Sequence, residues 1–297
     1  MLLYQAFQLT VRSHFRLPGF KQLEHAQDAD IEIVREKVPN HLEQRNDNAI
    51  CWQANAEDIL ISLPDIARIR ISKGKKVSIW SLDNNKHCAI SLFLINQVLP
   101  LALMQRGYSV LHAAVIGIQG KAVAIAGHSG AGKSVLCAHL DQLSYPILSD
   151  ESCVLLNLPD MQFTAFSGSE HLQLWKDCFY KPAFRERKGE PVRKGVKKYF
   201  YHTKTAKPLS LALDGIVILN NAYQSINTPH QLTEKQAFIN LLEHSLHAHH
   251  LKGTLLSKQV FETCANIAHS LPVFELNRPE SLESLAHIDQ HITPLFQ

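Results

Sequence analysis

Residues 127 to 134 are the part of this sequence best suited to chemistry. They read GHSGAGKS and match the pattern G-x-x-x-x-G-K-[ST] of a phosphate loop. In such a loop the glycines let the backbone approach an anion, the lysine adds a mobile positive charge, and the serine hydroxyl is a ligand for Mg²⁺. The residues expected to hold the phosphates of a nucleoside triphosphate are Gly127, His128, Ser129, Gly130, Ala131, Gly132, Lys133 and Ser134.

An acidic pair follows the loop along the chain. Asp150 and Glu151 come 17 and 18 residues after Lys133, at the end of an apolar segment. Phosphoryl transfer to a hydroxyl uses carboxylates of two kinds, one that binds Mg²⁺ and one that takes the proton of the attacking hydroxyl. The pair therefore predicts a kinase site. A solvated acidic turn after a strand is the alternative interpretation.

Several histidines also need an interpretation. His112 lies 21 residues before Lys133 in an apolar segment, where a histidine is either a core residue or part of the site. A second group of histidines lies close together in the sequence: His244, His247, His249 and His250. These histidines suit a polar helix end, where positive charge complements the helix dipole, and a metal site is the alternative.

Residues 181 to 207 form the most basic segment of the chain. Ten of the 30 lysines and arginines lie there, among prolines and glycines that break regular structure, so we expect a mobile loop followed by a strand at 198–202. Cations on such a loop would neutralise charge on a migrating phosphoryl group. The candidates are Arg193, Lys197 and Lys198. A solvated loop is the alternative, and a nucleic-acid partner is not expected because no nucleic-acid-binding fold is recognisable.

Strands and a helix must position these residues around the loop. The apolar run 121–126 predicts a strand that enters the loop, and apolar residues at helical spacing predict a helix from Ser134 to Leu143. A strand at 145–149 then ends at the acidic pair. Because the carboxyl ends of parallel strands meet at one edge of a sheet, a right-handed β-α-β unit would place the acidic pair beside the loop.

The other expected elements divide the chain into two domains. Residues 1–87 predict a small β-rich domain, and residues 88–297 predict an α/β (α+β) domain that contains the loop. The expected strands of the first domain are 1–11, 31–34, 49–53, 59–63, 66–71 and 77–80. The second domain begins with an amphipathic helix at 88–106 that Gly107 ends. Its further elements are strands at 110–118, 212–219 and 273–276 and helices at 233–251, 255–268 and 279–292.

Composition sets the broad class of the protein. The net charge of +3 is too mild to indicate a nucleic-acid or membrane-surface partner. Six cysteines without a CxxC pair favour a reducing cytosol, and residues 1–11 lack the basic leader of a secretory signal. The longest apolar run, 89–104, is interrupted by polar residues and short for a membrane span. We therefore expect a buried helix there, no membrane partner and a cytoplasmic protein.

Three motifs in order carry a resemblance to a known family. The run LHAA at 111–114, the loop at 127–134 and LSDE at 148–151 resemble the catalytic domain of the HPr kinase/phosphorylase family, and more closely its HPr kinase-related group. The arrangement also resembles the nucleotide site of ATP-dependent phosphoenolpyruvate carboxykinase. The resemblance implies a carboxykinase-like kinase domain that binds ATP and Mg²⁺. It implies that His112 lies beside the phosphates and that Asp150 acts as the base. It also implies that Ser134 and Glu151 bind Mg²⁺, with Asp150 as a further candidate ligand.

The chain departs from that family in two places. Glu151 stands where the family commonly has a second aspartate, which leaves the division of roles between Asp150 and Glu151 open. The glycine-rich signature of HPr kinase/phosphorylase is missing, and residues 171–175 read HLQLW, as in the related kinases. We therefore expect a serine of a protein or peptide, and not HPr, as the phosphate acceptor. A small-molecule kinase and an ATP-binding regulatory module without phosphotransfer remain the alternatives, and a homo-oligomer stays open.

Overall fold

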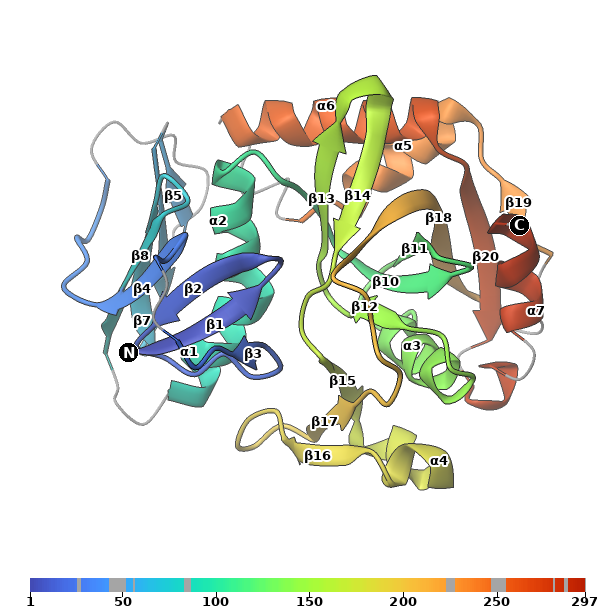
Figure 1. Cartoon of the computed structure of the whole chain (residues 1–297), viewed down its shortest axis with the longest axis horizontal. Helices are drawn as coiled ribbons and strands as arrows, with labels where there is room; N and C mark the ends of the chain where they lie inside the picture. Colours follow the sequence, from blue (N-terminus) through green and yellow to red (C-terminus); the bar gives the residue numbers. More distant parts are fainter. Residues whose placement is uncertain are drawn as a thin grey trace. The chain divides into compact units, whose positions relative to one another are not determined.

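The computed structural model describes residues 1–25, 28–42, 52–55, 57–82, 87–222, 228–246, 255–279, 281–285 and 288–296. These residues form a mixed α/β structure with large sheets and several helices (Figure 1). The chain divides into two compact units, Met1–Val110 with His247–Phe261 and Leu111–Leu246 with Glu262–Gln297. The first unit thus includes helical residues that the sequence assigned to the second domain, and the expected domain boundary at 87/88 stays a prediction.

A single sheet is the framework of the first unit, with the strand order β3-β1-β2-β4-β8-β7-β6-β5. Its strands are β1 (Leu2–Ala6), β2 (Leu9–Ser13), β3 (Lys21–Gln22), β4 (Ile31–Arg35), β5 (Trp52–Ala54), β6 (Asp58–Leu63), β7 (Ala67–Ser72) and β8 (Lys76–Ser81). Segment 1–11 is a hairpin and not one strand, because Phe7 and Gln8 have φ angles of 50° and 64° and reverse the chain. The expected strand at 49–53 lies partly outside the described residues, and the other expected strands are confirmed.

The helix expected at 88–106 is also confirmed. It consists of α1 (His87–Phe93), a π-helical turn η2 (Leu94–Val98) and α2 (Leu99–Gln105). The amides of Gly107 and Tyr108 donate to the carbonyls of Met104 and Leu103, with Gly107 at a φ of 89°, so the helix ends in a Schellman motif. Within the described part of the chain, this is the helix long and apolar enough to cross a membrane, with a mean hydropathy of 1.7. Because 61% of its most apolar window is buried in the structure, and a buried core helix meets the same criteria, that length is weak evidence for a membrane span.

The second unit is organised around another large sheet, which runs in the order β12-β10-β11-β18-β14-β13, with β20 beside β18 and β19 beside β20. The strands are β10 (Ala113–Ile118), β11 (Lys121–Ala126), β12 (Ile147–Ser149), β13 (Cys153–Leu158), β14 (Gln162–Phe166), β18 (Ser210–Ala222), β19 (His230–Gln231) and β20 (Val273–Pro279). Strand β10 is antiparallel to both β11 and β12, and β18 is parallel to both β11 and β20. The carboxyl ends of β11, β12, β18 and β20 therefore meet at one edge, as the sequence predicted for the first two.

Helix α3 (Lys133–Gln142) follows the phosphate loop and packs on this sheet. Its residues Leu136, Cys137 and Leu140 are buried in the same core as Ile116 of β10 and Ile125 of β11. The strand expected at 110–118 is divided at His112 into β9 (Ser109–Leu111) and β10. The strands at 121–126 and 145–149 and the helix after the loop are confirmed, the second strand in shortened form.

The basic segment 181–207 is more regular than the sequence suggested. It contains the helix α4 (Pro182–Arg185), the strand β16 (Lys188–Pro191) and the expected strand β17 (Lys198–His202). The two strands form a small sheet with β15 (His171–Trp175), in the order β15-β17-β16. The 3-10 turn η4 (Lys176–Tyr180) leads from β15 to α4. Only residues 192–197 connect β16 to β17, so the prediction of a loop up to residue 197 was wrong.

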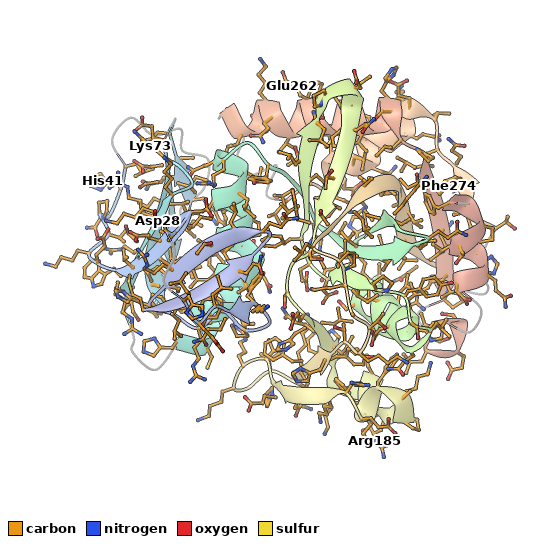
Figure 2. All side chains as sticks on the ribbon, viewed as in Figure 1. Asp28, His41, Lys73, Arg185, Glu262 and Phe274 are labelled. Carbon is orange, nitrogen blue, oxygen red and sulfur yellow. The ribbon has the colours of Figure 1, made fainter. Side chains whose placement is uncertain are left out.

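This small sheet is attached to α3 through a buried carboxylate. Asp141 accepts hydrogen bonds from the Tyr201 hydroxyl at 2.9 Å and from the amides of Lys204 and Thr205 at 3.1 Å and 3.0 Å. The carboxylate is fully buried. Figure 2 shows Arg185 of α4 pointing outward, on the far side of this sheet from α3.

The C-terminal elements agree only in part with the sequence. Helix α5 (Glu234–Glu243) begins with a capping box between Thr233 and Gln236 but ends earlier than expected, and α6 (Leu255–Ser270) and β20 are confirmed. The closing helix expected at 279–292 is wrong. In its place are three short turns, η5 (Glu283–Leu285), α7 (Asp289–Ile292) and η6 (Thr293–Phe296). Of the second group of histidines, His247, His249 and His250 lie outside the described residues.

Candidate active site

The phosphate loop leaves β11 and turns directly into α3. Gly127, Gly130 and Gly132 have φ angles of 150°, 91° and 90°, which a side chain would disfavour. Gly127 must also be glycine for space, because a Cβ there would lie 2.4 Å from the Leu219 carbonyl oxygen of β18. Since α3 begins at Lys133, the first amides of the helix and its positive dipole end face the loop, which suits an anion.

Lys133 is folded back over its own loop. Its Nζ donates to the carbonyls of Gly127 at 2.7 Å and His128 at 3.2 Å, and the residue is buried. Burial lowers the pKa of Lys133, and the charges of Glu151 and Asp150 partly offset this. The amine is therefore close to two carboxylates and already desolvated.

Asp150 lies just past the end of β12, in a tight turn that the Ser149 hydroxyl closes by donating to the Ser152 carbonyl at 2.7 Å. Its Oδ2 accepts the amide of Gln173 from β15 at 3.0 Å, and Oδ1 has no hydrogen-bond partner within the described part of the chain. Burial, and secondarily the charge of Glu151, raise the pKa of Asp150 to about 7, while the Ser134 hydroxyl acts in the opposite direction. This carboxyl is thus poised to gain or lose a proton near neutral pH.

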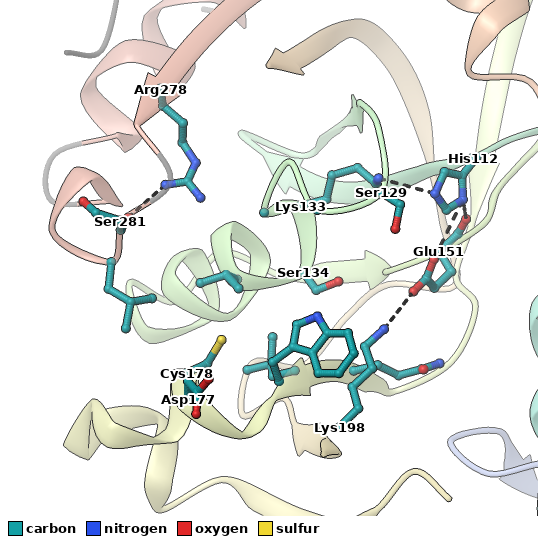
Figure 3. Close-up of a pocket in the computed structure, with 17 residues that line it drawn as sticks. His112, Ser129, Lys133, Ser134, Glu151, Asp177, Cys178, Lys198, Arg278 and Ser281 are labelled. Atoms are coloured by element: carbon teal, nitrogen blue, oxygen red, sulfur yellow. Dashed lines mark hydrogen bonds and ion pairs between the residues drawn. The ribbon is translucent and has the colours of Figure 1, made fainter. Parts of the chain in front are cut away.

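His112 connects the lysine to the second carboxylate. Its Nε2 lies 3.4 Å from Lys133 Nζ, and its Nδ1 lies 3.1 Å from the Glu151 carbonyl oxygen (Figure 3). Burial and then the Lys133 charge lower the pKa of His112, which favours a neutral ring that accepts at Nε2 and donates at Nδ1. The backbone amide of His112 donates to the His244 carbonyl at 2.8 Å and holds the segment in place.

Glu151 is the meeting point of the charged side chains. One carboxylate oxygen lies 3.7 Å from Lys198 Nζ of β17, and the other lies 3.8 Å from His112 Nδ1. Lys198 Nζ is also 6.0 Å from the ring centre of Trp175. The small sheet thus delivers a cation to the acidic pair, although the sequence predicted a loop for most of this segment.

These residues surround one pocket of about 520 Å³. Its charged end contains His112, Glu151 and Lys198, and Figure 3 shows Arg278, Ser281 and Cys178 on the opposite side. Apolar side chains complete the lining between the polar groups. They are Val135, Leu174, Trp175 and Leu282.

The predicted site residues fall into three groups. Eight of them line the pocket, namely His112, Ser129, Gly130, Gly132, Lys133, Ser134, Glu151 and Lys198. The second group is buried or belongs to the loop without lining the pocket: Asp150 lies beside Ser134, and the others are Gly127, His128 and Ala131. His128 Nε2 lies 3.3 Å from a Glu243 carboxylate oxygen, and its ring contacts the ring of His244. Arg193 and Lys197 are exposed and do not line the pocket. The structure therefore brings together most of the expected site but only one of its three expected basic residues.

Two residues of the site were missed from the sequence. Arg278 lines the pocket from the end of β20, and Gln173 fixes Asp150 through its backbone amide. Both depend on pairing between distant segments. The available signal was a polar residue at the end of an apolar strand, 273–276, which in a parallel sheet points to the functional edge.

The donor set near the loop fits Mg²⁺ bound together with a nucleotide. Ser134 and Glu151 offer a hydroxyl and a carboxylate, and Asp150 has a buried oxygen without a partner in the described residues. Hard oxygen ligands of this kind suit Mg²⁺, which usually keeps waters and phosphate oxygens as its other ligands. The described residues hold no group of three or more His, Cys, Asp or Glu side chains that could bind a metal by themselves.

Neither family models nor curated proteins match this chain. The functional interpretation therefore depends on the geometry of the pocket and on the three motifs.

The cysteines within the described residues, Cys88, Cys137, Cys153, Cys178 and Cys264, are free thiols.

Proposed function

We propose that this chain is an ATP-dependent kinase that transfers the γ-phosphate of ATP to a hydroxyl, with a serine of a protein or peptide as acceptor. One observation carries the proposal. Asp150, a buried carboxyl whose pKa is raised to about 7, lies beside Ser134 of the phosphate loop at the shared edge of β11 and β12. A buried carboxyl beside the loop hydroxyl, with a pKa near neutral, suits proton transfer from an acceptor hydroxyl.

Asp150, which is buried beside the pocket, and the groups that line the pocket each have a role in this reaction. The loop amides and Lys133 bind the phosphates, and Ser134 and Glu151 hold Mg²⁺, which would neutralise phosphate charge when bound. Asp150 takes the proton of the acceptor hydroxyl. Lys198 screens the negative charge that develops during transfer. Neutral His112 contacts both Lys133 Nζ and the Glu151 carbonyl and so fixes these two residues relative to one another.

The acceptor class comes from the resemblance of the motifs. The runs at 111–114, 127–134 and 148–151 resemble HPr kinase-related proteins with a carboxykinase-like nucleotide site, and the segment HLQLW supports a relative that does not act on HPr. In the structure this segment is β15, whose Gln173 amide holds Asp150. The part of the chain that distinguishes it from HPr kinase/phosphorylase therefore contacts the proposed base.

The proposal is tested with γ-labelled ATP, Mg²⁺ and two acceptor mixtures, a serine-containing peptide library and a metabolite pool. We expect label in the peptides, loss of transfer by a factor of about 100 or more in Asp150→Asn, and full transfer in Asp160→Asn. Asp160 is a matched control because it is exposed and outside the pocket, and its φ of 62° suits asparagine.

Other outcomes would contradict the proposal in different ways. Label only in the metabolite pool would make the protein a small-molecule kinase. Binding of ATP without transfer to either mixture would favour a regulatory module. Full transfer by Asp150→Asn would exclude this carboxyl as the base.

A further inference from the structure

Arg278 occupies the pocket from the side opposite the acidic pair. It is the sixth residue of β20, which pairs in parallel with β18, itself the parallel neighbour of the strand that enters the phosphate loop. The residue is 3% exposed and lines the pocket. An arginine is thus buried at the same sheet edge as the loop, although the proposed transfer chemistry does not use it.

The guanidinium is held in a fixed orientation. Its Nη1 donates to the carbonyls of Pro279 and Ser281, each at 3.0 Å, and contacts the Ser284 hydroxyl. Ser284 Oγ lies 2.8 Å from both of these carbonyl oxygens and donates its one hydrogen to one of them. A buried arginine fixed by three oxygens keeps one geometry at little further cost in entropy. This suits recognition of a rigid anionic group.

The other arm of the guanidinium lies against the loop. A Cβ added to Gly132 would come within 2.2 Å of Nη2 and 3.2 Å of Cζ, so this glycine leaves room for the arginine as well as adopting a φ of 90°. Gly132 immediately precedes α3, whose first amides are expected to bind phosphate. The positive charge of Arg278 therefore lies beside the part of the loop where α3 starts.

The position relative to Glu151 decides which phosphates Arg278 would meet. Figure 3 shows Arg278 and Ser281 on one side of Lys133, with His112 and Glu151 on the other. In the proposed kinase the transferred phosphate lies at the acidic pair, since Asp150 must reach the acceptor hydroxyl there. The opposite side is left for the phosphates that remain in the product nucleotide.

We propose that Arg278 binds the diphosphate part of the nucleotide and so contributes to the affinity for ADP and ATP alike. The inference rests on the proposed function, because it assumes that the loop binds a nucleotide. A cation on the diphosphate contacts phosphates that ATP and ADP share, so its loss should raise KM for ATP and weaken ADP binding. Because the β-phosphate gains negative charge as it leaves, loss of Arg278 should also lower kcat.

The test is calorimetric titration of the full chain with ADP and AMP in the presence of Mg²⁺, for wild type, Arg278→Gln, Arg278→Lys and Arg185→Gln. We expect ADP binding to weaken about tenfold to a hundredfold in Arg278→Gln, which is the range for a lost hydrogen bond to a charged group, and less in Arg278→Lys. AMP binding should weaken less than ADP binding, a difference that general damage to the fold would not produce. Arg185→Gln should bind as wild type, because Arg185 lies outside the pocket.

Failure of this inference differs from failure of the proposed function. If folded Arg278 variants bind ADP like wild type, or lose ADP and AMP affinity equally, Arg278 does not bind the diphosphate, and the kinase proposal stands. If the wild-type chain binds neither nucleotide, both proposals are wrong. Should neither Arg278 variant fold, Ser284→Ala decides, because it removes one fixing contact and keeps the arginine. An unchanged ADP to AMP affinity ratio in that variant overturns the inference, and a several-fold loss specific to ADP supports it.

Discussion

At the scale of single residues, the site depends on how burial changes the protonation of neighbouring groups. Asp150 has a raised pKa and His112 and Lys133 have lowered ones, each because burial disfavours the charged form. Burial thus shifts the pKa of each group in the direction of its neutral form. It also means that pH should reveal the site before any ligand is added.

The pH dependence of stability should identify Asp150. Its pKa is raised from 3.8 to about 7 on folding, so between these values the folded protein holds a proton that the unfolded chain has lost. The contribution of Asp150 to the free energy of unfolding should therefore fall as pH rises from about 4 to about 7 and then level off, while His171 and His244, whose pKa values burial lowers to about 4, contribute in the opposite direction. Asp150→Asn removes the Asp150 contribution alone, so the difference in free energy of unfolding between wild type and this variant should fall across the window. Urea unfolding across the window measures both proteins, and parallel pH profiles would show that Asp150 is not perturbed.

Two basic residues near one another in sequence should differ in their effect. Lys198 Nζ lies 3.7 Å from Glu151, whereas Arg193 is exposed and outside the pocket. Lys198→Gln should lower the rate of phosphate transfer about tenfold or more, because a cation beside the developing charge is lost. Arg193→Gln should change it little. Steady-state kinetics with the acceptor found by labelling compares the two variants. Equal losses would mean that the basic segment as a whole, and not Lys198 in particular, neutralises the developing charge.

At the scale of elements, the site is assembled by two attachments to α3. The helix brings the loop and its own first turn, and the small sheet β15-β17-β16 brings Gln173 and Lys198. Asp141 near the end of α3 joins the two elements by accepting hydrogen bonds from Tyr201, Lys204 and Thr205. The position of Lys198 is therefore expected to depend on a carboxylate nine residues before Asp150.

Substitutions at this attachment should reduce stability in a graded way. Asp141→Ala leaves a buried hydroxyl and two amides without their acceptor and should lower the free energy of unfolding by about 3 kcal/mol. Tyr201→Phe removes one of these hydrogen bonds and should cost about 1 kcal/mol. Chemical denaturation of both variants is the measurement. Equal effects would mean that the amides find other partners.

The same elements show what could be predicted from the sequence. The strand 121–126, the loop and α3 are local features, so pattern and spacing were sufficient for them. The strand β16 was missed because Gly189 and Pro191 normally indicate a loop, yet Gly189 lies where a Cβ would come 2.3 Å from the His202 ring of β17, and Pro191 ends the strand. Arg278 was missed because only the long-range pairing of β18 with β20 brings it to the loop.

At the scale of the whole molecule, neither unit is one continuous stretch of chain. The chain passes from one unit to the other after Val110, after Leu246 and after Phe261, and the last of these boundaries falls within α6. The first unit contains its own link between these stretches, since Gln259 donates to the Tyr108 carbonyl at 2.8 Å. A cut made by sequence position alone would separate residues that belong together.

A fragment of residues 111–297 should therefore be less stable than the whole chain. It keeps residues 255–261 of α6, among them the buried Val260, but lacks Tyr108 and the rest of the unit to which these residues belong. We expect a lower melting temperature and more aggregation than for the full chain. Thermal unfolding by circular dichroism compares the two. A fragment that melts like the whole protein would show that the unit folds alone.

The backward fold of Lys133 has a consequence for selectivity. With the Lys133 amine bonded to the carbonyls of Gly127 and His128, the loop is held in shape by one of its own side chains. An incoming anion has to compete with these two carbonyl oxygens for the ammonium group. A small monovalent ion such as chloride gains too little to do so, whereas a polyphosphate also meets the amides at the start of α3. We therefore expect the loop to bind ligands with several negative charges in preference to monovalent anions.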